Sequence, residues 1–405
     1  MTGSVDDVAT GERLAGLLRQ LVSVPSVSRN EARLASEIEG MLAGCTAAGG
    51  ILVERVGDCV IARAGVSPGC QGRAGIIAAA HLDTVPPRKD GVAASITGDE
   101  AGSGTGGEPS GAGETWIGGL GAVDTKASVA VLLDLLMYPP DPSVGLTCIF
   151  YPCEEVTREE NGLRRLVASR PDIFEADAAV VGEPTGGLVE AGCQGTMLAR
   201  IRIAGASAHT ARPWRGVNAV HLLGSLLERV LEFPGREVRM AGCTYYEQLQ
   251  AVHVDGGGVT NVVPDRASCV LNYRFAPDRD AAVAVEALES FIFGGTGRAG
   301  VPALDWVDRA SFELIEVASG APPSLDNPFL AALVSLVGAP PKGKLGWTDA
   351  ATFFEAGIPA CNFGPGDPEL AHTPHERVSV SELVKARNAL AALLGSAVSS
   401  TAGTS

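Results

Sequence analysis

The run Gly75-Ile-Ile-Ala-Ala-Ala-His-Leu-Asp83 is the most informative stretch of this chain. Its small and apolar first part is typical of a short strand that is buried on both faces of a parallel sheet. His81 and Asp83 follow that strand directly. Positions two apart in an extended chain project to the same side, so both side chains can address one point. The run therefore predicts an α/β sheet with a polar site at the end of a strand.

Two more apolar runs end in acids. Leu146–Tyr151 leads into Glu154-Glu155, and Ala178–Gly182 leads into Glu183. Open α/β sheets bind ligands at the carboxyl ends of their strands, so these acids are expected to meet. Imidazoles and carboxylates without a Cys-x-x-Cys pair favour a hydrolytic zinc site over a structural one. The candidate ligand-type residues are His81, Asp83, Asp124, Glu154, Glu155, Glu183 and His372.

The chain resembles a known family in the order and neighbours of these residues. It is similar to the dinuclear zinc deacylases and peptidases, which include acetylornithine deacetylase, aminoacylase and succinyl-diaminopimelate desuccinylase. The matching motifs are His81-Leu-Asp-Thr-Val-Pro86, Gly121-Ala-Val-Asp-Thr-Lys126, Cys153-Glu-Glu155, Gly182-Glu-Pro-Thr185 and Ala371-His372. A narrower resemblance, to one type of desuccinylase, rests on Glu190-Ala-Gly-Cys-Gln-Gly-Thr196, Leu271-Asn-Tyr-Arg-Phe-Ala-Pro-Asp278, Gly346-Trp-Thr-Asp349 and Phe363-Gly-Pro-Gly-Asp-Pro368.

The resemblance implies a pair of zinc ions, with cobalt or manganese able to substitute at one site. Asp124 would bridge the two ions. His81 and Glu183 would complete one site, and Glu155 and His372 the other. Zinc accepts imidazole nitrogen and carboxylate oxygen at roughly 2.0–2.2 Å, which agrees with this set. Any one such residue at a strand end is more often simply hydrogen-bonded or solvated, so the interpretation depends on all five occurring in family order.

The resemblance also assigns roles beside the metals. Glu154 would be the general base that takes a proton from the zinc-bound water and returns it to the leaving amine. Asp83 would orient His81 by accepting its second ring proton. Cys153 adjoins Glu154 but is expected to be a packing residue rather than a nucleophile.

Three residues outside the metal motifs match substrate-side positions of the family. His209 would reach across a dimer to stabilise the tetrahedral oxyanion, although a loop histidine that caps a turn is the alternative. Asn261 and Arg274 would contact substrate, since the guanidinium fork suits a carboxylate. For Arg274 the alternative is an ordinary charge on a sheet surface.

The resemblance implies a metal-dependent amide hydrolase. The expected reaction converts N-succinyl-LL-2,6-diaminopimelate to succinate and LL-2,6-diaminopimelate, for lysine and peptidoglycan synthesis. A related N-acyl amino acid deacylase, of the acetylornithine deacetylase type or a biosynthetic paralogue, is the first alternative, because Thr125, the long Gly-rich insertion and His375 depart from the family pattern. A zinc-binding scaffold without catalysis is the second, and the intact Glu154 argues against it.

A nucleotide-binding loop is a different interpretation of Gly119-Leu-Gly-Ala-Val-Asp-Thr-Lys126, which precedes a predicted helix from Lys126 to Met137. A Walker loop needs glycine immediately before its lysine, and the dinucleotide fingerprint needs glycine where Asp124 stands. Thr125 stands where the first template needs glycine, and Asp124 where the second does, so both templates fail. The glycines are better explained by a tight turn that presents Asp124 at the helix start.

Length and pattern predict two domains, since 405 residues are many for one core. Residues 1–193 and 317–405 would form an α/β catalytic domain with a mixed sheet flanked by helices. Residues 194–316 would be an inserted α+β domain, because alternation begins at Thr196 and strands then mix with helices. The resemblance implies that this domain forms the dimer interface and lid. The Gly-rich stretch 98–113 reads as a surface insertion, passive or shading the site, and the tail from about 396 as disordered.

The termini, cysteines and charge narrow the partners. The start Met1-Thr-Gly-Ser-Val-Asp-Asp has no basic segment or long apolar run, and nine cysteines show no scaffold spacing. We therefore expect a cytoplasmic protein with reduced thiols. A net charge of −16 argues against nucleic acid or anionic membrane as partners. The resemblance implies two partners, a small anionic N-acyl amino acid and a second copy of the chain.

Overall fold

The computed structural model describes residues 5–47, 50–64, 75–87, 114–140, 144–294 and 306–396. The predicted insertion at 98–113 and the tail beyond Ser396 lie outside the described residues. The chain divides into two compact units. Unit 1 comprises Met1–Ala191, Pro323–Lys342 and Thr348–Ser405, and unit 2 comprises Gly192–Pro322 and Gly343–Trp347. Among the described helices, none is long and apolar enough to cross a membrane.

The described part of unit 1 is built on an eight-stranded sheet in the order β1-β2-β5-β3-β6-β15-β7-β14. Its strands are β1 (Ile51–Val56), β2 (Cys59–Ala64), β3 (Gly75–His81), β5 (Gly145–Tyr151), β6 (Ala178–Val181), β7 (Glu190–Ala191), β14 (Lys342–Gly343) and β15 (Ala360–Asn362). The central strands β5, β3, β6 and β15 are parallel, whereas β1 and β2 are antiparallel. This confirms the predicted mixed sheet, and the parallel centre brings several strand ends to one edge.

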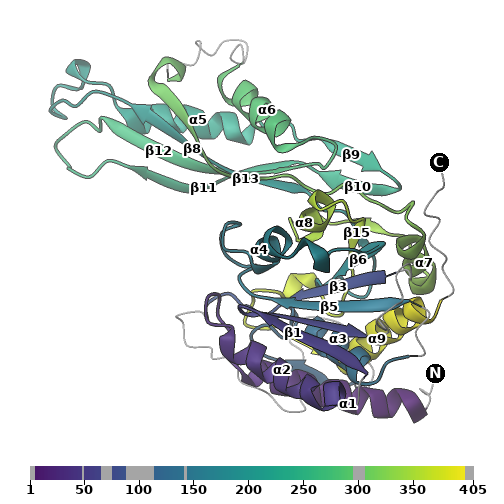
Figure 1. The fold of residues 1–405 in the computed structure, drawn as a ribbon. Coiled ribbons are helices and arrows are strands. Elements are labelled where there is room, and N and C mark those ends of the chain that lie inside the picture. The colour runs from purple at the N-terminus through teal and green to yellow at the C-terminus, as the bar shows by residue number, and fades with distance from the viewer. Residues whose placement is uncertain are drawn as a thin grey trace. The chain divides into compact units, whose positions relative to one another are not determined.

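Helices cover both faces of this sheet (Figure 1). On one face lie α1 (Val5–Ser23), α2 (Ala32–Ala47), α3 (Lys126–Met137) and α9 (Val380–Gly395), and on the other α4 (Gly162–Ser169) and α8 (Ala350–Glu355). Helix α7 (Pro328–Val337) packs against α9. Helix α3 begins at Lys126 as predicted and is buried along nearly its whole length, because it is built from Ala, Val and Leu.

A buried carboxylate joins three of these helices. Asp134 of α3 is fully buried and accepts hydrogen bonds from Arg13 of α1 at 2.8 Å and from Arg387 of α9 at 3.0 Å. Buried carboxylates are tolerated when they are paired in this way. The cluster fixes the helical layer under the sheet.

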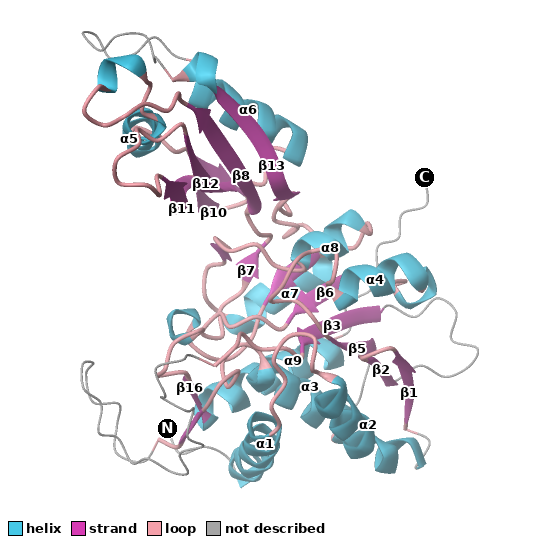
Figure 2. Cartoon of the chain, turned by 90° about the vertical axis from the view of Figure 1, so that its left-hand side faces the viewer, coloured by secondary structure: helices cyan, strands magenta, loops and turns pink. Residues whose placement is uncertain are grey.

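Unit 2 holds a four-stranded antiparallel sheet in the order β11-β12-β8-β13, with α5 and α6 on one face (Figure 2). Its elements are β8 (Gly195–Ala204), α5 (Ala219–Leu231), β9 (Glu237–Met240), β10 (Cys243–Tyr246), β11 (Gln248–Gly256), β12 (Arg266–Phe275), α6 (Ala281–Phe293) and β13 (Ala310–Ala318). Alternation along β8 buries Met197, Ala199, Ile201 and Ile203 against the helices. The boundary expected at residue 316 falls inside β13, whose backbone pairs with β8, so unit 2 extends to Pro322.

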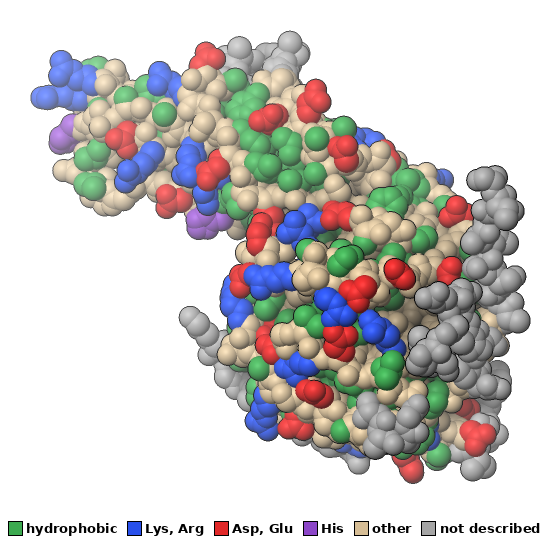
Figure 3. Space-filling model, viewed as in Figure 1, with side chains coloured by type: hydrophobic (Ala, Val, Ile, Leu, Met, Phe, Trp, Pro, Cys, Tyr) green, Lys and Arg blue, Asp and Glu red, His purple; other side chains and the backbone are tan. Residues whose placement is uncertain are grey.

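Acidic and basic side chains are interspersed on the face drawn in Figure 3. Among the described residues, ion pairs join Arg29 with Glu160 and Arg158 with Glu355. The negative net charge is therefore mixed with positive groups on this face rather than gathered into one patch.

Candidate active site

The carboxyl ends of three parallel strands bring four of the predicted site residues together. His81 ends β3, Glu154 and Glu155 follow β5, and Glu183 follows β6. The register sets His81 opposite Tyr151 of β5 and Ala79 opposite Val181 of β6. Ligand-type side chains from all three strands are therefore delivered to one edge of the sheet, as expected for an open α/β sheet.

Asp124 lies between two imidazoles. Its Oδ1 is 3.0 Å from Nε2 of His81, and its Oδ2 is 3.2 Å from Nε2 of His372. His372 Nε2 is also 2.7 Å from Oε1 of Glu155. One carboxylate thus offers one oxygen to each side, which is the donor arrangement that a ligand shared by two metal ions requires.

The described residues contain two groups whose ligand atoms all lie within 4.8 Å of one another. One is His81, Glu154 and Glu155, and the other is Asp124, Glu155 and His372. The second group matches one predicted zinc site. Glu183 lies outside both groups although it is buried nearby, so its assignment to the first ion stays a prediction. Imidazole nitrogens with carboxylate oxygens suit zinc, and also manganese or iron.

The electrostatics of this cluster favour a cation. Hydrogen bonds to Asp124 and Glu155 raise the pKa of His372 to about 10. Burial alone would lower the pKa of His81, but Asp124 and Asp83 outweigh it and hold that pKa well above its ordinary value. Burial would raise the pKa of Asp124, yet the two imidazoles lower it. The surrounding carboxylates therefore favour positive charge at this cluster, from a metal ion or from protonated imidazoles.

Glu154, beside this cluster, has a carboxylate whose surroundings suit it to accept a proton. Burial raises its pKa well above the ordinary value, and the carboxylates of Glu183 and Glu155 add to that effect, while His81 opposes it. A carboxylate with a raised pKa is a better base near neutral pH. Its role as the general base stays a prediction of the sequence.

Asp83 is fully buried beside His81, and its backbone oxygen and its carboxylate make different contacts. The Nδ1 atom of His81 lies 3.0 Å from the backbone oxygen of Asp83 and 3.5 Å from its carboxylate Oδ1. The carboxylate accepts the backbone N–H groups of Glu154 at 2.9 Å and of Glu155 at 3.0 Å. It also accepts the hydroxyl of Ser28 at 2.8 Å. Asp83 therefore anchors the loop with the two glutamates as well as the imidazole.

A second buried acid, not predicted from the sequence, anchors the same loop. Glu31 is 1% exposed, and its Oε1 accepts the backbone N–H of Cys153 and the N–H of Arg29, each at 3.0 Å. Cys153 has a positive φ of 63°, a conformation that non-glycine residues adopt at a cost. Glu31 stands just before α2, where an acid is ordinarily a helix-start residue, so only the contact identifies it.

The remaining predicted residues belong to unit 2. His209 and Asn261 lie on two neighbouring loops. An isolated antiparallel β-bridge pairs His209 with Val262, and the backbone N–H of Thr210 donates to the backbone oxygen of Asn261. Both side chains are exposed. Arg274 lies on β12 and is half-buried. Burial lowers the pKa of its guanidinium, and among the described residues no carboxylate pairs with it. The roles of all three stay predictions.

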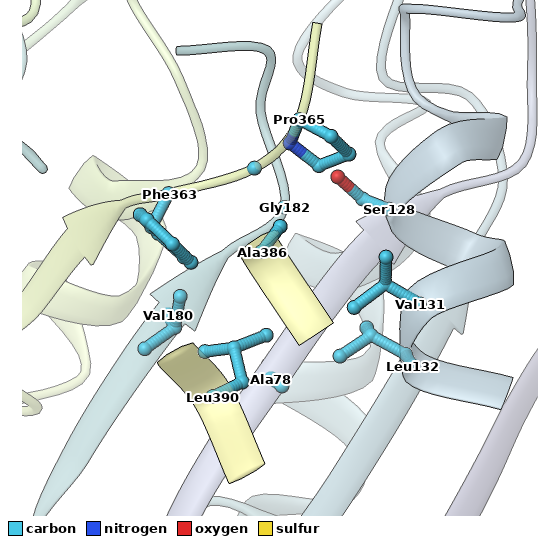
Figure 4. Close-up of a pocket in the computed structure, with 11 residues that line it drawn as sticks. Ala78, Ser128, Val131, Leu132, Val180, Gly182, Phe363, Pro365, Ala386 and Leu390 are labelled. Carbon is cyan, nitrogen blue, oxygen red and sulfur yellow. The ribbon is translucent and has the colours of Figure 1, made fainter. Parts of the chain in front are cut away.

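Two hollows in unit 1 do not coincide with this cluster. One is a cavity of about 10 Å³. It lies among Ala78, Val180, Phe363 and Leu390, with Ser128 and Gly182 at one end (Figure 4). That is room for about one water, and the lining is almost entirely apolar. A larger groove of about 590 Å³ lies between α7 and α9. The chemistry is therefore placed by the converging ligand groups and not by cavity size.

Comparison with known proteins agrees with this geometry. The family model for peptidase family M20/M25/M40 matches residues 77–396. A Mycobacterium tuberculosis protein named "Putative succinyl-diaminopimelate desuccinylase DapE" is 41% identical over 379 residues, covering 94% of this chain and 97% of the relative. Succinyl-diaminopimelate desuccinylase of Corynebacterium glutamicum is 36% identical over 371 residues, covering 91% and 92%.

Solved structures share the fold. The Bacillus cereus aminopeptidase PepT aligns with a TM-score of 0.68 at 19% identity, covering 95% of this chain and 98% of that one. A Bacillus subtilis protein described as a dinuclear metal binding peptidase from the M20 family aligns with a TM-score of 0.64 at 18% identity, covering 96% and 98%. At this level of identity the likeness concerns the architecture alone.

Proposed function

Because the chain belongs to peptidase family M20/M25/M40, we propose that it is a metal-dependent hydrolase that removes the succinyl group from N-succinyl-LL-2,6-diaminopimelate. Water cleaves the amide bond, and the products are succinate and LL-2,6-diaminopimelate. The observation that carries the proposal is the convergence of His81, Glu155 and His372 around Asp124, together with 36–41% identity to named desuccinylases over nearly the whole chain. In this proposal the protein works in the cytoplasm, in lysine and peptidoglycan synthesis.

The residues present fit two zinc ions. His372, Glu155 and Asp124 would hold one ion, and His81 with Asp124 and Glu183 the other. When bound, the metals supply Lewis acidity that polarises the scissile carbonyl and lowers the pKa of water. The protonated imidazoles that occupy the cluster without metal must then give up their protons.

Glu154 performs the proton transfers in this proposal. Its carboxylate accepts a proton from the attacking water and later delivers it to the nitrogen of the departing amine. Asp83 holds the backbone N–H of Glu154, so the base reaches the reacting atoms from a fixed loop. General acid–base catalysis of this kind contributes roughly 10²- to 10⁴-fold.

Arg274 supports an anionic substrate. A half-buried guanidinium costs desolvation energy, and within the described residues no carboxylate offsets that cost. A substrate carboxylate would supply a bidentate partner. In this proposal Arg274 and Asn261 bind the acyl amino acid, and His209 stabilises the oxyanion from the partner of a dimer.

The dimer would form through unit 2. Strand β11 is at one edge of its sheet, and almost every residue of that strand is exposed. Val252 and Val254 are 56% and 50% exposed. An exposed apolar edge strand is a ready template for pairing with another chain. Light scattering should therefore give twice the chain mass, and Val252→Lys should shift the protein toward the monomer.

The first test is a direct assay. The purified zinc-loaded protein is given N-succinyl-LL-2,6-diaminopimelate or N-acetylornithine, and amide loss is followed with a chelator-treated control. The proposal predicts metal-dependent cleavage of the succinyl compound. Preference for the acetyl compound would identify a related deacylase, and no turnover by a folded, metal-loaded protein would reject both.

A further inference from the structure

A buried acid accepts hydrogen bonds from the loop that carries Asp124. Neither the sequence nor the comparisons single it out. Glu376 is 6% exposed. Its Oε2 accepts the N–H of Gly121 at 3.0 Å, and its Oε1 accepts the N–H groups of Val123 at 2.9 Å and Asp124 at 3.1 Å. One side chain therefore binds three backbone donors in the short loop that presents the shared carboxylate.

The backbone around Glu376 ties the same two segments together. Its carbonyl accepts the N–H of Gly119 at 3.1 Å. Directly after it, β16 (Arg377–Ser379) pairs in antiparallel register with β4 (Trp116–Gly118), which leads into the loop. His372 lies four residues before Glu376 on the same segment. The loop with Asp124 and the segment with His372 thus meet at Glu376.

A carboxylate is specifically suited to this position. Three N–H groups divided between two oxygens need two acceptors, and a neutral amide offers one acceptor and a donor. Lys126 is 2% exposed and donates to the oxygen of Val24 at 2.8 Å. Burial lowers the pKa of its ammonium to about 8, and the nearby Glu376 opposes part of that shift. This buried ammonium offsets part of the cost of the buried charge.

We propose that Glu376 is a positioning residue for the metal centre, which sets the Asp124 carboxylate relative to His372 before any metal binds. The inference rests on the proposed metal site. Some residues do not touch the metal but hydrogen-bond to its ligands. Mutation of such residues commonly changes metal affinity by roughly 10- to 100-fold. Glu376 acts on the backbone of its ligand rather than on the ligand's side chain.

The test compares Glu376→Gln with a matched variant, Asp134→Asn. Both remove a buried carboxylate, but Asp134 serves the arginines between α1, α3 and α9. We expect calorimetric zinc titration of Glu376→Gln to show at least tenfold weaker binding of one equivalent, and Glu376→Asp to recover part of it. Asp134→Asn should lower Tm and leave zinc affinity unchanged. Two equivalents bound by Glu376→Gln with wild-type affinity would overturn the proposal.

A second measurement needs no variant. In metal-free wild-type protein, hydrogen exchange should find the amides of Gly121, Val123 and Asp124 already protected, because Glu376 holds them without metal. Exchange of these amides at the rate of an unstructured chain would refute the inference even if Glu376→Gln failed to fold. Failure of the wild-type protein itself to bind zinc would instead refute the proposed function, so the two failures are distinguishable.

Discussion

The carboxylate of Asp83 accepts the backbone N–H of Glu154 at 2.9 Å, across 71 positions of sequence. The end of β3 thereby holds the residue that follows β5, and the proposed base is fixed through its main chain. Its side chain stays available for chemistry. Preorganisation of this kind lowers the cost of reaching the reactive geometry.

Replacement of Glu154 tests the proposed base. Glu154→Gln keeps the shape of the side chain but removes the proton acceptor, so kcat should fall by roughly 10²- to 10⁴-fold. Zinc content, measured by atomic absorption, should stay at the wild-type level. Glu159→Gln, an exposed neighbour, is the control and should retain full activity. Near-normal turnover by Glu154→Gln would remove this residue from the mechanism.

Replacement of Asp124 tests the shared ligand. Asp124→Asn leaves one oxygen in place of the two that face His81 and His372. We expect the number of bound zinc ions to drop and activity to be lost, since this one carboxylate faces both imidazoles. A variant that still binds two equivalents at wild-type affinity would show that Asp124 is not the shared ligand.

Metal binding should depend on pH. The pKa of His372 is about 10 without metal, so at pH 7 its ring carries a proton that a metal must displace. Zinc affinity should rise with pH by about tenfold per unit for each proton released. Calorimetry in buffers of different ionisation enthalpy counts those protons. A pH-independent affinity between pH 6.5 and 8.5 would contradict the protonated cluster.

The same groups set the pH dependence of the metal-free fold. The raised pKa of His372 means that its contacts stabilise the folded state fully below the usual histidine pKa of about 6.5, and less as the pH rises toward about 10. Thermal melts of chelator-treated protein should therefore show Tm falling over that range. His372→Gln should reduce the slope, and an unchanged slope would assign it to other groups.

Loss of Glu31 should loosen the loop that carries the base. Glu31→Ala leaves the N–H groups of Cys153 and Arg29 without their acceptor, which costs about 1–3 kcal/mol per buried donor. We expect a lower free energy of unfolding and a lower kcat. Glu31→Gln retains Oε1, the atom that accepts both hydrogen bonds. This variant should keep most of the free energy of unfolding and most of kcat. Equal loss in the two variants would mean that the charge matters more than the acceptor.

The oxyanion role of His209 needs a test in trans. Subunits with His209→Ala are mixed with subunits carrying Glu154→Gln, and a site built from one intact half of each should regain activity. Each mixed dimer has one working site of two, so a pure heterodimer should reach about half of wild-type turnover. Random mixing makes about half of the dimers mixed, so the mixture should reach about a quarter. No recovery in a verified heterodimer would count against the role.

Pattern alone was sufficient for much of unit 1. Apolar runs ending in His81, Glu155 and Glu183 predicted parallel strands with a site at their ends, because burial and alternation are local properties of a sequence. The helix from Lys126 was predicted for the same reason. The family resemblance, not the pattern, supplied the expected metals and the substrate.

Other features required the folded chain. Glu31 and Glu376 act by accepting backbone N–H groups of loops 122 and more than 250 residues away in sequence, and no local pattern marks such a partner. The C-terminal edge of unit 2 was also misjudged, since the pairing of β13 with β8 is a long-range contact. The sequence determined which residues are candidates for the chemistry, because metal binding and proton transfer each require particular side-chain types. Only the tertiary structure decided which buried acids hold them in place, because a backbone donor looks the same at every position until the fold brings an acceptor to it.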